Sequence, residues 1–269
     1  MVDGPSPGFC THSARRLLAA ALCSALSACS IQAAPPVGAV CAEHHPAGGA
    51  PALVNPKLAT GARTLCFGAF AVLHSGVTRA PLWVAEHLTR ASVEHARALD
   101  TRDNRFHPEE RLPTNERAEL ADYRGSGYDR GHMAPSGDMG DPEHDFESFS
   151  LANIVPQDGP LNRNGWADME NYVRDLAAKL GEAYVVTGPA YLGGSVRRLN
   201  GRVLVPTHVW KAVHVPGQGA GAWIATNDAS ARWEVVSIAE LTARVGIDPF
   251  PTLDAATRTK VPAFPTFED

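Results

Sequence analysis

Short runs of apolar residues, bounded by glycine, proline or polar residues, recur along the chain and predict β-strands. The predicted strands cover residues 65–73, 80–88, 183–187, 202–206, 208–213 and 222–226. Residues 100–127 are polar and charged without an apolar period, so we expect a long excursion over the surface.

One segment has the spacing of an amphipathic helix. Apolar residues from Met169 to Leu180 recur at intervals of three or four, and Gly181 provides a stop signal. A closing helix is predicted over residues 236–245. Because strands flank the central helix without a regular βαβ alternation, the pattern favours an α+β fold built around one sheet.

The first residues have the pattern of a secretory signal. Arg15 and Arg16 precede an apolar run, Leu17–Leu26, that is too short to span a bilayer, and small residues follow it. The tetrad Leu-Ser-Ala-Cys ending at Cys29 resembles a bacterial lipobox, which would be cut before Cys29 and leave its thiol lipidated. Cleavage within residues 31–34 is the alternative. We therefore expect export, as a periplasmic protein, an outer-membrane lipoprotein or a secreted protein.

The chain has five cysteines, and export decides how they are interpreted. Cys10 and Cys23 would leave with the signal, and Cys29 would be lipidated or removed. Cys41 and Cys66 then remain as an even pair in an oxidising compartment, which favours a disulfide between them. One buried and one free thiol is the alternative. Neither residue has a second Cys or His at zinc-ligand spacing.

The composition fits one globular domain with extensions. The chain has 269 residues, of which 44% are hydrophobic, and its formal net charge at pH 7 is -5. Single domains mostly hold about 100–200 residues and some reach about 250, and the apolar content is too high for a disordered chain. No uninterrupted apolar run approaches the ~18–20 residues of a membrane helix, so a polytopic membrane protein is excluded. The negative charge argues against a broadly basic nucleic-acid binder.

Residues 122–135 carry the strongest candidate chemistry. They read Asp-Tyr-Arg-Gly-Ser-Gly-Tyr-Asp-Arg-Gly-His-Met-Ala-Pro, and the glycines permit tight turns and close approach of a ligand. Asp129, Arg130 and His132 place an acid, a fixed cation and a titratable base within four residues. Histidine can take a proton from water and arginine can hold charge on phosphorus, so the cluster suits phosphodiester hydrolysis. A loop with an ion pair and a satisfied histidine is the structural alternative.

Two more motifs follow this segment. They are Asn-Ile-Val-Pro-Gln at residues 153–157 and Leu-Asn-x-x-x-Trp-x-x-x-Glu at residues 161–170. With Asp-Arg-Gly-His before them, their order and spacing closely resemble the DNA/RNA non-specific endonuclease family, whose relatives include mitochondrial endonuclease G. The resemblance runs from about Pro51 to about Phe250. Weaker matches lie at residues 81–85, 123–127, 186–188 and 206–211.

The resemblance implies a ββα-metal nuclease fold, also called the His-Me finger fold. In this α+β fold, a central, mostly antiparallel sheet is flanked by helices, and two strands and a helix cradle one divalent cation. We therefore expect four parts: a signal peptide at residues 1–28, an irregular N-terminal arm at 29–60, the endonuclease domain at 61–250 and a C-terminal tail at 251–269.

The resemblance also implies the roles of two residues. His132 is similar to the general base that activates the attacking water, and Asn162 to the single protein ligand of the metal. An amide oxygen is a hard ligand and Mg²⁺ keeps much of its water shell, so the donor suits Mg²⁺, with Mn²⁺ as an alternative. A cation that stabilises charge on the leaving 3′ oxygen implies 5′-phosphate products. The structural alternatives are a packing role for His132 and a helix cap for Asn162.

Further residues are expected to support the reaction. Glu170 and Arg174 are four apart on the predicted helix and share one face. Glu170 is expected to orient a metal-bound water, and Arg174 to pair with it or with phosphate. Asn153 is similar to a family residue that steadies the site, and Arg130 is expected to contact phosphate. An ordinary surface ion pair is the alternative for Glu170 and Arg174.

Two more arginines complete the predicted site. Arg102 is the expected second arginine at the transition state, although Arg105 could exchange roles with it. Arg124 is expected to bind the substrate together with Arg130 and Arg174. A solvated loop residue is the alternative for Arg102.

The sequence therefore predicts an exported, metal-dependent endonuclease that cleaves DNA and RNA with little sequence preference. Its partners would be DNA and RNA, with a membrane involved only through a lipid anchor, and the resemblance also allows a homodimer. The alternatives are a catalytically silent nucleic-acid-binding or surface protein on the same fold and an exported nucleotide phosphatase. The intact motif residues argue against the first, and the lack of clustered carboxylate or histidine ligands argues against the second.

The charge of the residues around the predicted site indicates how a substrate would be bound. Residues 97–130 contain seven arginines and eight acidic residues, so this segment gives no broad basic footprint. Cleavage needs only a few arginines and a cation at one phosphate. We therefore expect a local grip on nucleic acid that is sensitive to salt.

Overall fold

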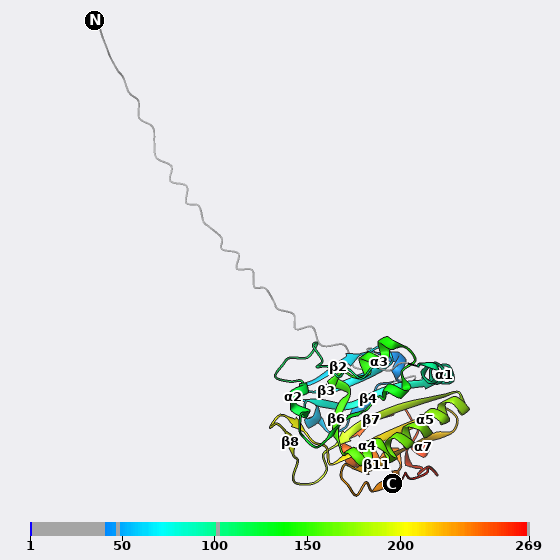
Figure 1. Cartoon of the computed structure of the whole chain (residues 1–269). Coiled ribbons are helices and arrows are strands. Elements are labelled where there is room, and N and C mark those ends of the chain that lie inside the picture. The colour runs from blue at the N-terminus through cyan, green and yellow to red at the C-terminus, as the bar shows by residue number, and fades with distance from the viewer. Residues whose placement is uncertain (2–40, 47–48, 101–102, 268–269) are drawn as a thin grey trace, which may run out of the picture. The chain divides into compact units, whose positions relative to one another are not determined.

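A seven-stranded antiparallel sheet lies at the centre of the part of the chain that the structure describes (Figure 1). This computed structural model describes Met1 and residues 41–46, 49–100 and 103–267. The strand order in the sheet is β12-β11-β10-β7-β4-β3-β2. The strands are β2 (Ala62–Cys66), β3 (Phe70–Ser75), β4 (Ala80–Thr89), β7 (Glu182–Ala190), β10 (His208–Val215), β11 (Gly219–Thr226) and β12 (Trp233–Val236). The predicted α+β fold with a central antiparallel sheet is confirmed.

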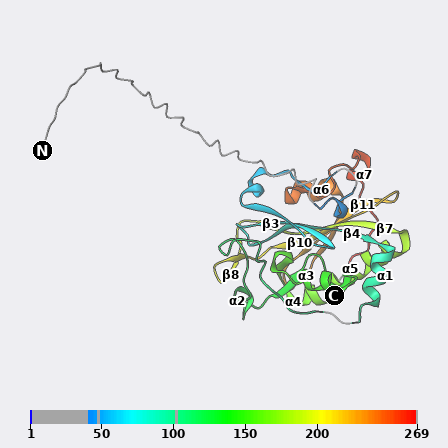
Figure 2. The ribbon, with the colours of Figure 1, turned by 90° about the horizontal axis from the view of Figure 1, so that it is seen from above.

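Helices cover both faces of this sheet, as the view in Figure 2 shows. On one side lie α6 (Ile238–Val245) and α7 (Ala255–Thr259). On the other side lie α1 (Arg90–Ala98), α3 (Pro142–Ser148), α4 (Gly159–Arg163) and α5 (Gly165–Leu180). The predicted closing helix at residues 236–245 is α6.

Each face of the sheet has its own apolar core. Val185 belongs to the core under α5, whereas the next residue, Val186, belongs to the core under α6. Successive side chains of a strand point to opposite faces, and here both faces are covered. This double burial explains why the central strands are continuous apolar runs in the sequence.

The central helix α5 is the predicted helix at residues 169–180. Its buried residues are Trp166, Met169, Val173 and Ala177, at intervals of three and four. It ends before Gly181, whose φ of 108° favours glycine. The predicted helix and its stop signal are both confirmed.

The first predicted strand, residues 65–73, is wrong in one respect. The structure divides it between β2 and β3, with a turn in which the Phe67 N–H donates to the Phe70 carbonyl at 2.9 Å. A residue of another element holds this turn in place, since the Gly68 N–H donates to the Glu147 carboxylate at 2.7 Å. A Cβ at Gly68 would lie 2.0 Å from the His144 ring, so a larger residue there would require that ring to move. The turn could not be predicted from the apolar run, because it depends on contacts with residues far away in the sequence.

Short elements complete the described fold. Three two-stranded pairings lie outside the main sheet: β1 (Ala52–Leu53) with β13 (Ile247–Asp248), β5 (Asp129–His132) with β6 (Ile154–Gln157), and β8 (Arg198–Leu199) with β9 (Val203–Leu204). The 3-10 helices are η2 (Ala42–His44), η3 (Pro56–Ala59), η4 (Ser136–Asp138) and η5 (Leu151–Asn153). In the described part of the predicted excursion, residues 103–127, the one helix is the four-residue α2 (Leu120–Tyr123).

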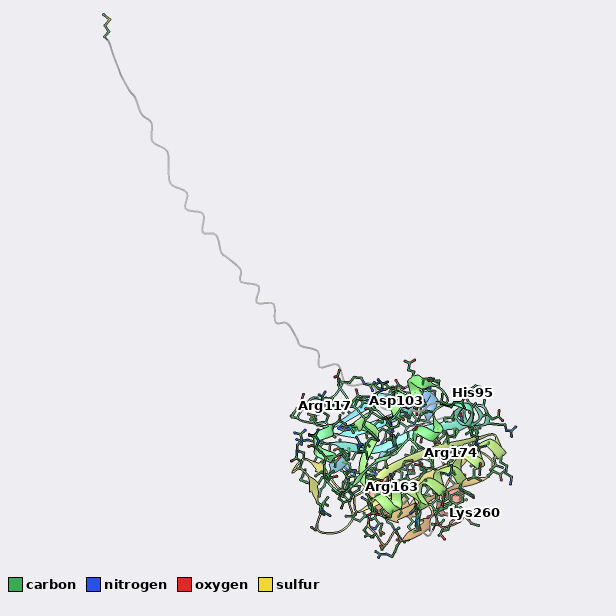
Figure 3. The ribbon with its side chains drawn as sticks, in the orientation of Figure 1. His95, Asp103, Arg117, Arg163, Arg174 and Lys260 are labelled. Carbon is green, nitrogen blue, oxygen red and sulfur yellow. A yellow bond between two sulfur atoms is a disulfide. The ribbon has the colours of Figure 1, made fainter. Side chains whose placement is uncertain are left out.

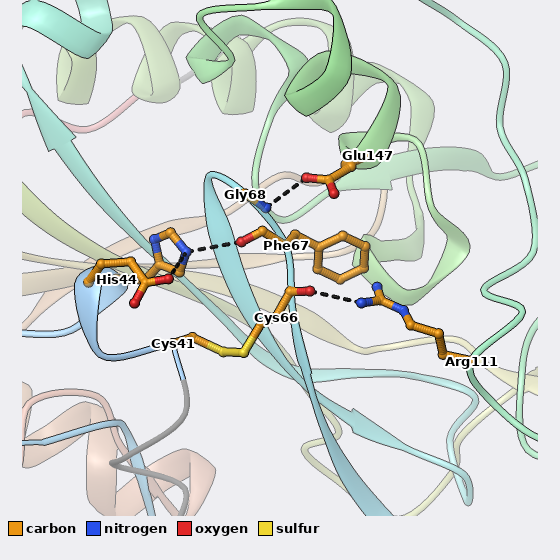
Figure 4. The surroundings of a disulfide bond; sticks show 8 residues. Cys41, His44, Cys66, Phe67, Gly68, Arg111 and Glu147 are labelled. Atoms are coloured by element: carbon orange, nitrogen blue, oxygen red, sulfur yellow. Dashed lines mark hydrogen bonds and ion pairs between the residues drawn. A yellow bond between two sulfur atoms is a disulfide. The ribbon is translucent and has the colours of Figure 1, made fainter.

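A disulfide joins Cys41 to Cys66, as predicted (Figure 4). Their Cα atoms lie 5.6 Å apart, and the bond ties the segment before η2 to the end of β2. His44 then donates from Nε2 to the Phe67 carbonyl at 3.1 Å. His45 packs its ring edge-on against Trp83, so this part of the arm is buried.

Cys29, Arg102 and the predicted signal peptide lie outside the described residues. Among the described helices, none is long and apolar enough to cross a membrane. The described part of the predicted tail, residues 251–267, carries α7 and packs against the core, with the Phe264 ring stacked 4.4 Å from that of Trp223.

Candidate active site

The motif residues meet where β5 and β6 pair and α4 begins. In this antiparallel pair His132, the last residue of β5, lies opposite Ile154. Gly131 lies opposite Val155, and a Cβ on it would fall 2.0 Å from the Gln157 side chain. The close approach of the two strands therefore requires glycine beside His132.

His132 stands between aromatic rings. Its ring centroid lies 5.4 Å from that of Phe106 and 4.8 Å from that of Phe149. Burial, with a smaller contribution from the Arg130 charge, lowers the pKa of His132 to about 4. Its Nε2 is buried and has no hydrogen-bond partner among the described residues. The ring is therefore neutral at pH 7 and can accept a proton at an unoccupied nitrogen.

Asn162 lies on α4, one turn beyond β6. Its Nδ2 donates to Asp129 Oδ2 at 3.1 Å. The same carboxylate receives Arg163, whose Nε and Nη2 lie 2.8 and 2.6 Å from its two oxygens. Because the amide nitrogen is occupied by Asp129, the amide oxygen remains as the acceptor that a hard cation would use.

A pocket of about 670 Å³ brings the predicted residues together. Four of them line it: His132, Asn162, Arg130 and Arg124. The Arg130 guanidinium lies over the Phe106 ring at 4.0 Å from its centroid, so the cation is held flat against the wall. The pocket therefore combines a neutral base, an amide oxygen and two exposed arginines.

Asn153 is fully buried below the pocket and holds the backbone that follows His132. Its Nδ2 donates to the carbonyls of Ala134 and Ser148, both at 2.8 Å, and its Oδ1 accepts from the Ala134 N–H at 2.9 Å. Its carbonyl also accepts from the Met133 N–H at 3.0 Å. These bonds tie Asn153 to the two residues that follow His132.

Glu170 and Arg174 lie on α5 but do not line the pocket. Burial raises the pKa of Glu170 to about 7. Arg174, marked in Figure 3, pairs with Asp138 at 2.5 Å and donates to Asn171 at 2.7 Å. The ion pair between Arg174 and Glu170 expected from their spacing is therefore replaced by one to Asp138, because η4 brings that carboxylate over the helix.

Of the two arginines considered for the transition state, Arg102 and Arg105, the structure describes only the second. Arg102 is outside the described residues, and its alternative, Arg105, pairs with Asp103 at 2.6 Å. Arg105 does not line the pocket, whereas Arg163, also marked in Figure 3, does. One signal for Arg163 was missed in the sequence: this residue directly follows Asn162 in the motif.

Three buried residues were missed by the sequence analysis. They are Glu86, Asp138 and Lys211, which have exposed fractions of 1%, 7% and 1%. Each comes from a different element, β4, η4 or β10, so their approach to Glu170 depends on tertiary packing. Of the three, only Lys211 could have been noticed in the sequence, because it is the last residue of one of the weaker stretches of family resemblance.

Comparison with known proteins decides the family. The sequence profile of the DNA/RNA non-specific endonuclease family matches residues 49–256. This chain belongs to that family. The family and the fold that were expected from the sequence are thereby confirmed.

Named relatives and a solved structure agree with this assignment. Nuclease C1 of Cunninghamella echinulata var. echinulata is 40% identical over 168 residues, which cover 56% of this chain and 66% of that protein. Endonuclease G, mitochondrial, of Caenorhabditis elegans is 34% identical over 154 residues, covering 53% and 50%. A chain in the solved EndoG/EndoGI complex superposes with a TM-score of 0.65 and 28% identity, covering 72% of this chain and 88% of that one. The matched region spans 35% to 66% of the first three curated relatives.

The expectation of export is wrong in the light of these relatives. Several of them carry mitochondrial names, including the Caenorhabditis elegans protein, and none of the comparisons supports export. An apolar run after two arginines does not separate a secretory signal from other N-terminal targeting segments, which explains the error. The lipobox interpretation of Cys29 depended on export and has no further support.

Proposed function

We propose that this member of the DNA/RNA non-specific endonuclease family is a divalent-metal-dependent endonuclease that hydrolyses phosphodiester bonds of DNA and RNA. One observation carries the proposal: His132 and Asn162 line the same pocket as Arg130 and Arg124. A neutral base, an oxygen donor and fixed cations are the groups that this hydrolysis needs.

The donor set fits a hard cation. Among the described residues, no three His, Cys, Asp or Glu side chains stand together in a way that could hold a metal ion. Asn162 would hold the cation through its amide oxygen, and Mg²⁺, which keeps several waters, suits one protein oxygen, with Mn²⁺ as the alternative. When bound, the cation supplies positive charge at the phosphate and at the leaving oxygen.

The chain's own residues would act on water and phosphate. His132 is neutral at physiological pH, and its ring, which lines the pocket, would take a proton from the attacking water. Arg130 and Arg124 would hold the phosphate from the pocket wall, and cleavage on the 3′-oxygen side would leave 5′-phosphate products. Glu170, on α5, would orient water around the cation.

Little sequence preference is expected on physical grounds. Contacts to phosphate carry no information on base identity, and the proposed contacts are arginines and a cation. The net charge of -5 gives no general attraction to nucleic acid. Binding should therefore be local and should weaken as salt increases.

Digestion of a plasmid and of RNA, with and without EDTA, tests this function. We expect cleavage in Mg²⁺, none in EDTA, and a loss of at least about 100-fold in His132→Ala. His95→Ala, on the exposed face of α1, is the matched control and should retain activity. Full activity in His132→Ala would remove this residue from the mechanism, and cleavage that persists in EDTA would remove the metal.

A second variant tests the ligand by itself. Asn162→Ala should raise the Mg²⁺ concentration for half-maximal cleavage by about 10-fold or more. Asn115→Ala changes an exposed asparagine whose side chain bonds to no other described residue, and it should leave the Mg²⁺ requirement unchanged. Equal Mg²⁺ requirements in the two variants would contradict the assignment of Asn162.

A further inference from the structure

A lysine is buried in the centre of the sheet, directly beneath the candidate active site. Lys211 lies on β10 and is 1% exposed. Its Nζ donates to Thr187 Oγ1 at 2.8 Å and to the Met133 carbonyl at 3.3 Å. Met133 immediately follows His132, so the ammonium is tied to the backbone that carries the proposed base.

The register of the sheet explains this placement. Lys211 pairs directly with Thr187 on β7, and Thr187 with Val84 on β4. Paired residues of antiparallel strands point to the same face, and so does Glu86, two residues beyond Val84. This is the face that α5 covers, since Val209, two residues before Lys211, belongs to the core under α5.

The ammonium is surrounded by groups that a buried charge requires. Its nitrogen lies 5.8 Å from the centroid of the Trp166 ring. Burial raises the pKa of Glu86 and that of Glu170, and the Lys211 charge opposes this effect in both. Glu86 has one buried oxygen, Oε2, without a hydrogen-bond partner among the described residues. A buried charge of this kind is costly unless it is paired and hydrogen-bonded.

The Met133 peptide is held on both sides. Its N–H donates to the Asn153 carbonyl, and its own carbonyl accepts from Lys211. Asn153 also binds both backbone groups of Ala134. The two residues after His132 are therefore fixed at all four backbone polar groups, three by Asn153 and one by Lys211.

Two of the weaker stretches of family resemblance lie side by side at this point, and neither contains a proposed catalytic residue. Residues 186–188 contain Thr187, and residues 206–211 end at Lys211. The sheet register places these two residues opposite each other.

We propose that Lys211 is a positioning residue of the active site, which holds the Met133 carbonyl so that His132 keeps its place in the pocket and whose charge acts on the buried Glu86 carboxyl on the same face of the sheet. This inference rests on the proposed function for the role of His132. Lys211 does not line the pocket, so it acts through other residues and not on the substrate.

The test is the full chain carrying Lys211→Met, which keeps the aliphatic stem and removes the donors and the charge. We expect kcat to fall about 10-fold or more while KM for DNA stays within about 2-fold, because the pocket wall is untouched. Lys179→Met, an exposed lysine near the end of α5, is the matched control and should leave both constants unchanged. Unchanged kcat in Lys211→Met would overturn the proposal.

A double variant separates positioning from stability. Lys211→Met removes a positive charge that favours the ionised form of Glu86, and adding Glu86→Gln removes the carboxyl on which that charge acts, so it should recover part of any lost thermal stability. The double variant should keep the low kcat, because the Met133 carbonyl is still unheld. Wild-type kcat in the recovered double variant would assign Lys211 to stability alone.

A measurement without activity distinguishes this proposal from the proposed function. NMR signals of the His132 ring should shift or broaden in Lys211→Met and stay in place in Lys179→Met. If the wild type cleaves no nucleic acid, the proposed function fails, yet a shift of these signals still supports the structural link. Unmoved His132 signals in Lys211→Met contradict the link whether or not the protein cleaves.

Discussion

The Asn162 side chain donates from Nδ2 to the Asp129 carboxylate at 3.1 Å, across the junction of α4 and β5. An amide can present either its oxygen or its nitrogen to a ligand, and a carboxylate accepts only from the nitrogen. Asp129 therefore determines which end of the amide is left for a cation. Such partners of a ligand commonly affect metal affinity as much as 10- to 100-fold, by order of magnitude.

We therefore predict that Asp129→Ala raises the Mg²⁺ concentration for half-maximal cleavage by about 10-fold. A titration of cleavage rate against Mg²⁺ measures this change. Arg163→Met is the matched control, because it removes the ion pair to Asp129 and leaves the bond to Asn162 in place. If Arg163→Met reproduces the full effect, the ion pair and not the amide orientation is responsible.

The pH dependence of cleavage should follow Glu170 and not His132. The pKa of His132 is about 4, so the base is neutral throughout the range above pH 5. The pKa of Glu170 is about 7, so its carboxylate forms as the pH rises through 7. We expect kcat/KM at low Mg²⁺ to rise with pH around a midpoint near 7, and Glu170→Gln to lose this rise. A rise that persists unchanged in Glu170→Gln would point to another group.

A buried histidine in the arm should make stability fall in acid. Burial lowers the pKa of His45 to about 4, and neither ring nitrogen has a hydrogen-bond partner among the described residues. The unfolded chain takes up a proton near pH 6.5 and the folded chain only near pH 4, so stability is lost as the pH falls through that window. His45→Phe should raise the free energy of unfolding by about 1 kcal/mol at pH 7 and by about 2 kcal/mol more at pH 4.

Urea unfolding at several pH values measures the effect of His45→Phe. The exposed His95 serves as the control position, since His95→Phe should not change the slope of stability with pH. An equal gain in stability at every pH would show that packing against Trp83, and not proton uptake, is the cause.

The disulfide should contribute to stability without affecting cleavage. It closes a loop with a sequence separation of 25 residues, for which the loss of unfolded-chain entropy gives about 3 kcal/mol. Replacing both Cys41 and Cys66 by Ser should lower the free energy of unfolding by about this amount and leave kcat/KM unchanged. Dithiothreitol should destabilise the wild type similarly and have no effect on the variant. Loss of cleavage in a folded variant would contradict this separation.

Most residues of the pocket could be predicted from local motifs, because these residues are close together in the sequence. Asp129, Arg130 and His132 occupy one strand, and Asn162 follows the strand that pairs with it. The position of α5 followed from its apolar period, since a single face of that helix is buried. These features depend on intervals of a few residues, which a sequence displays directly.

Other features depend on contacts between distant segments. Arg174 pairs with Asp138, 36 positions earlier on η4, and nothing in the spacing of α5 reveals this. The turn within residues 65–73 depends on Glu147 and His144 of α3. Lys211 meets Thr187 through the register of the sheet, and Met133 through the packing of the β5 segment against that sheet. Apolar and charge patterns alone contain no information on these pairings.

The contact between Gly131 and Gln157 has a consequence for how this site can change over evolutionary time. Gln157 is fully buried, and its Cβ would lie 2.6 Å from a Cβ added at Gly131. That contact is with a Cβ atom, which every residue except glycine has, so a larger residue at 131 requires glycine at 157. Among homologous sequences position 131 should therefore stay glycine wherever position 157 is not, and the short strand that carries His132 inherits that constraint.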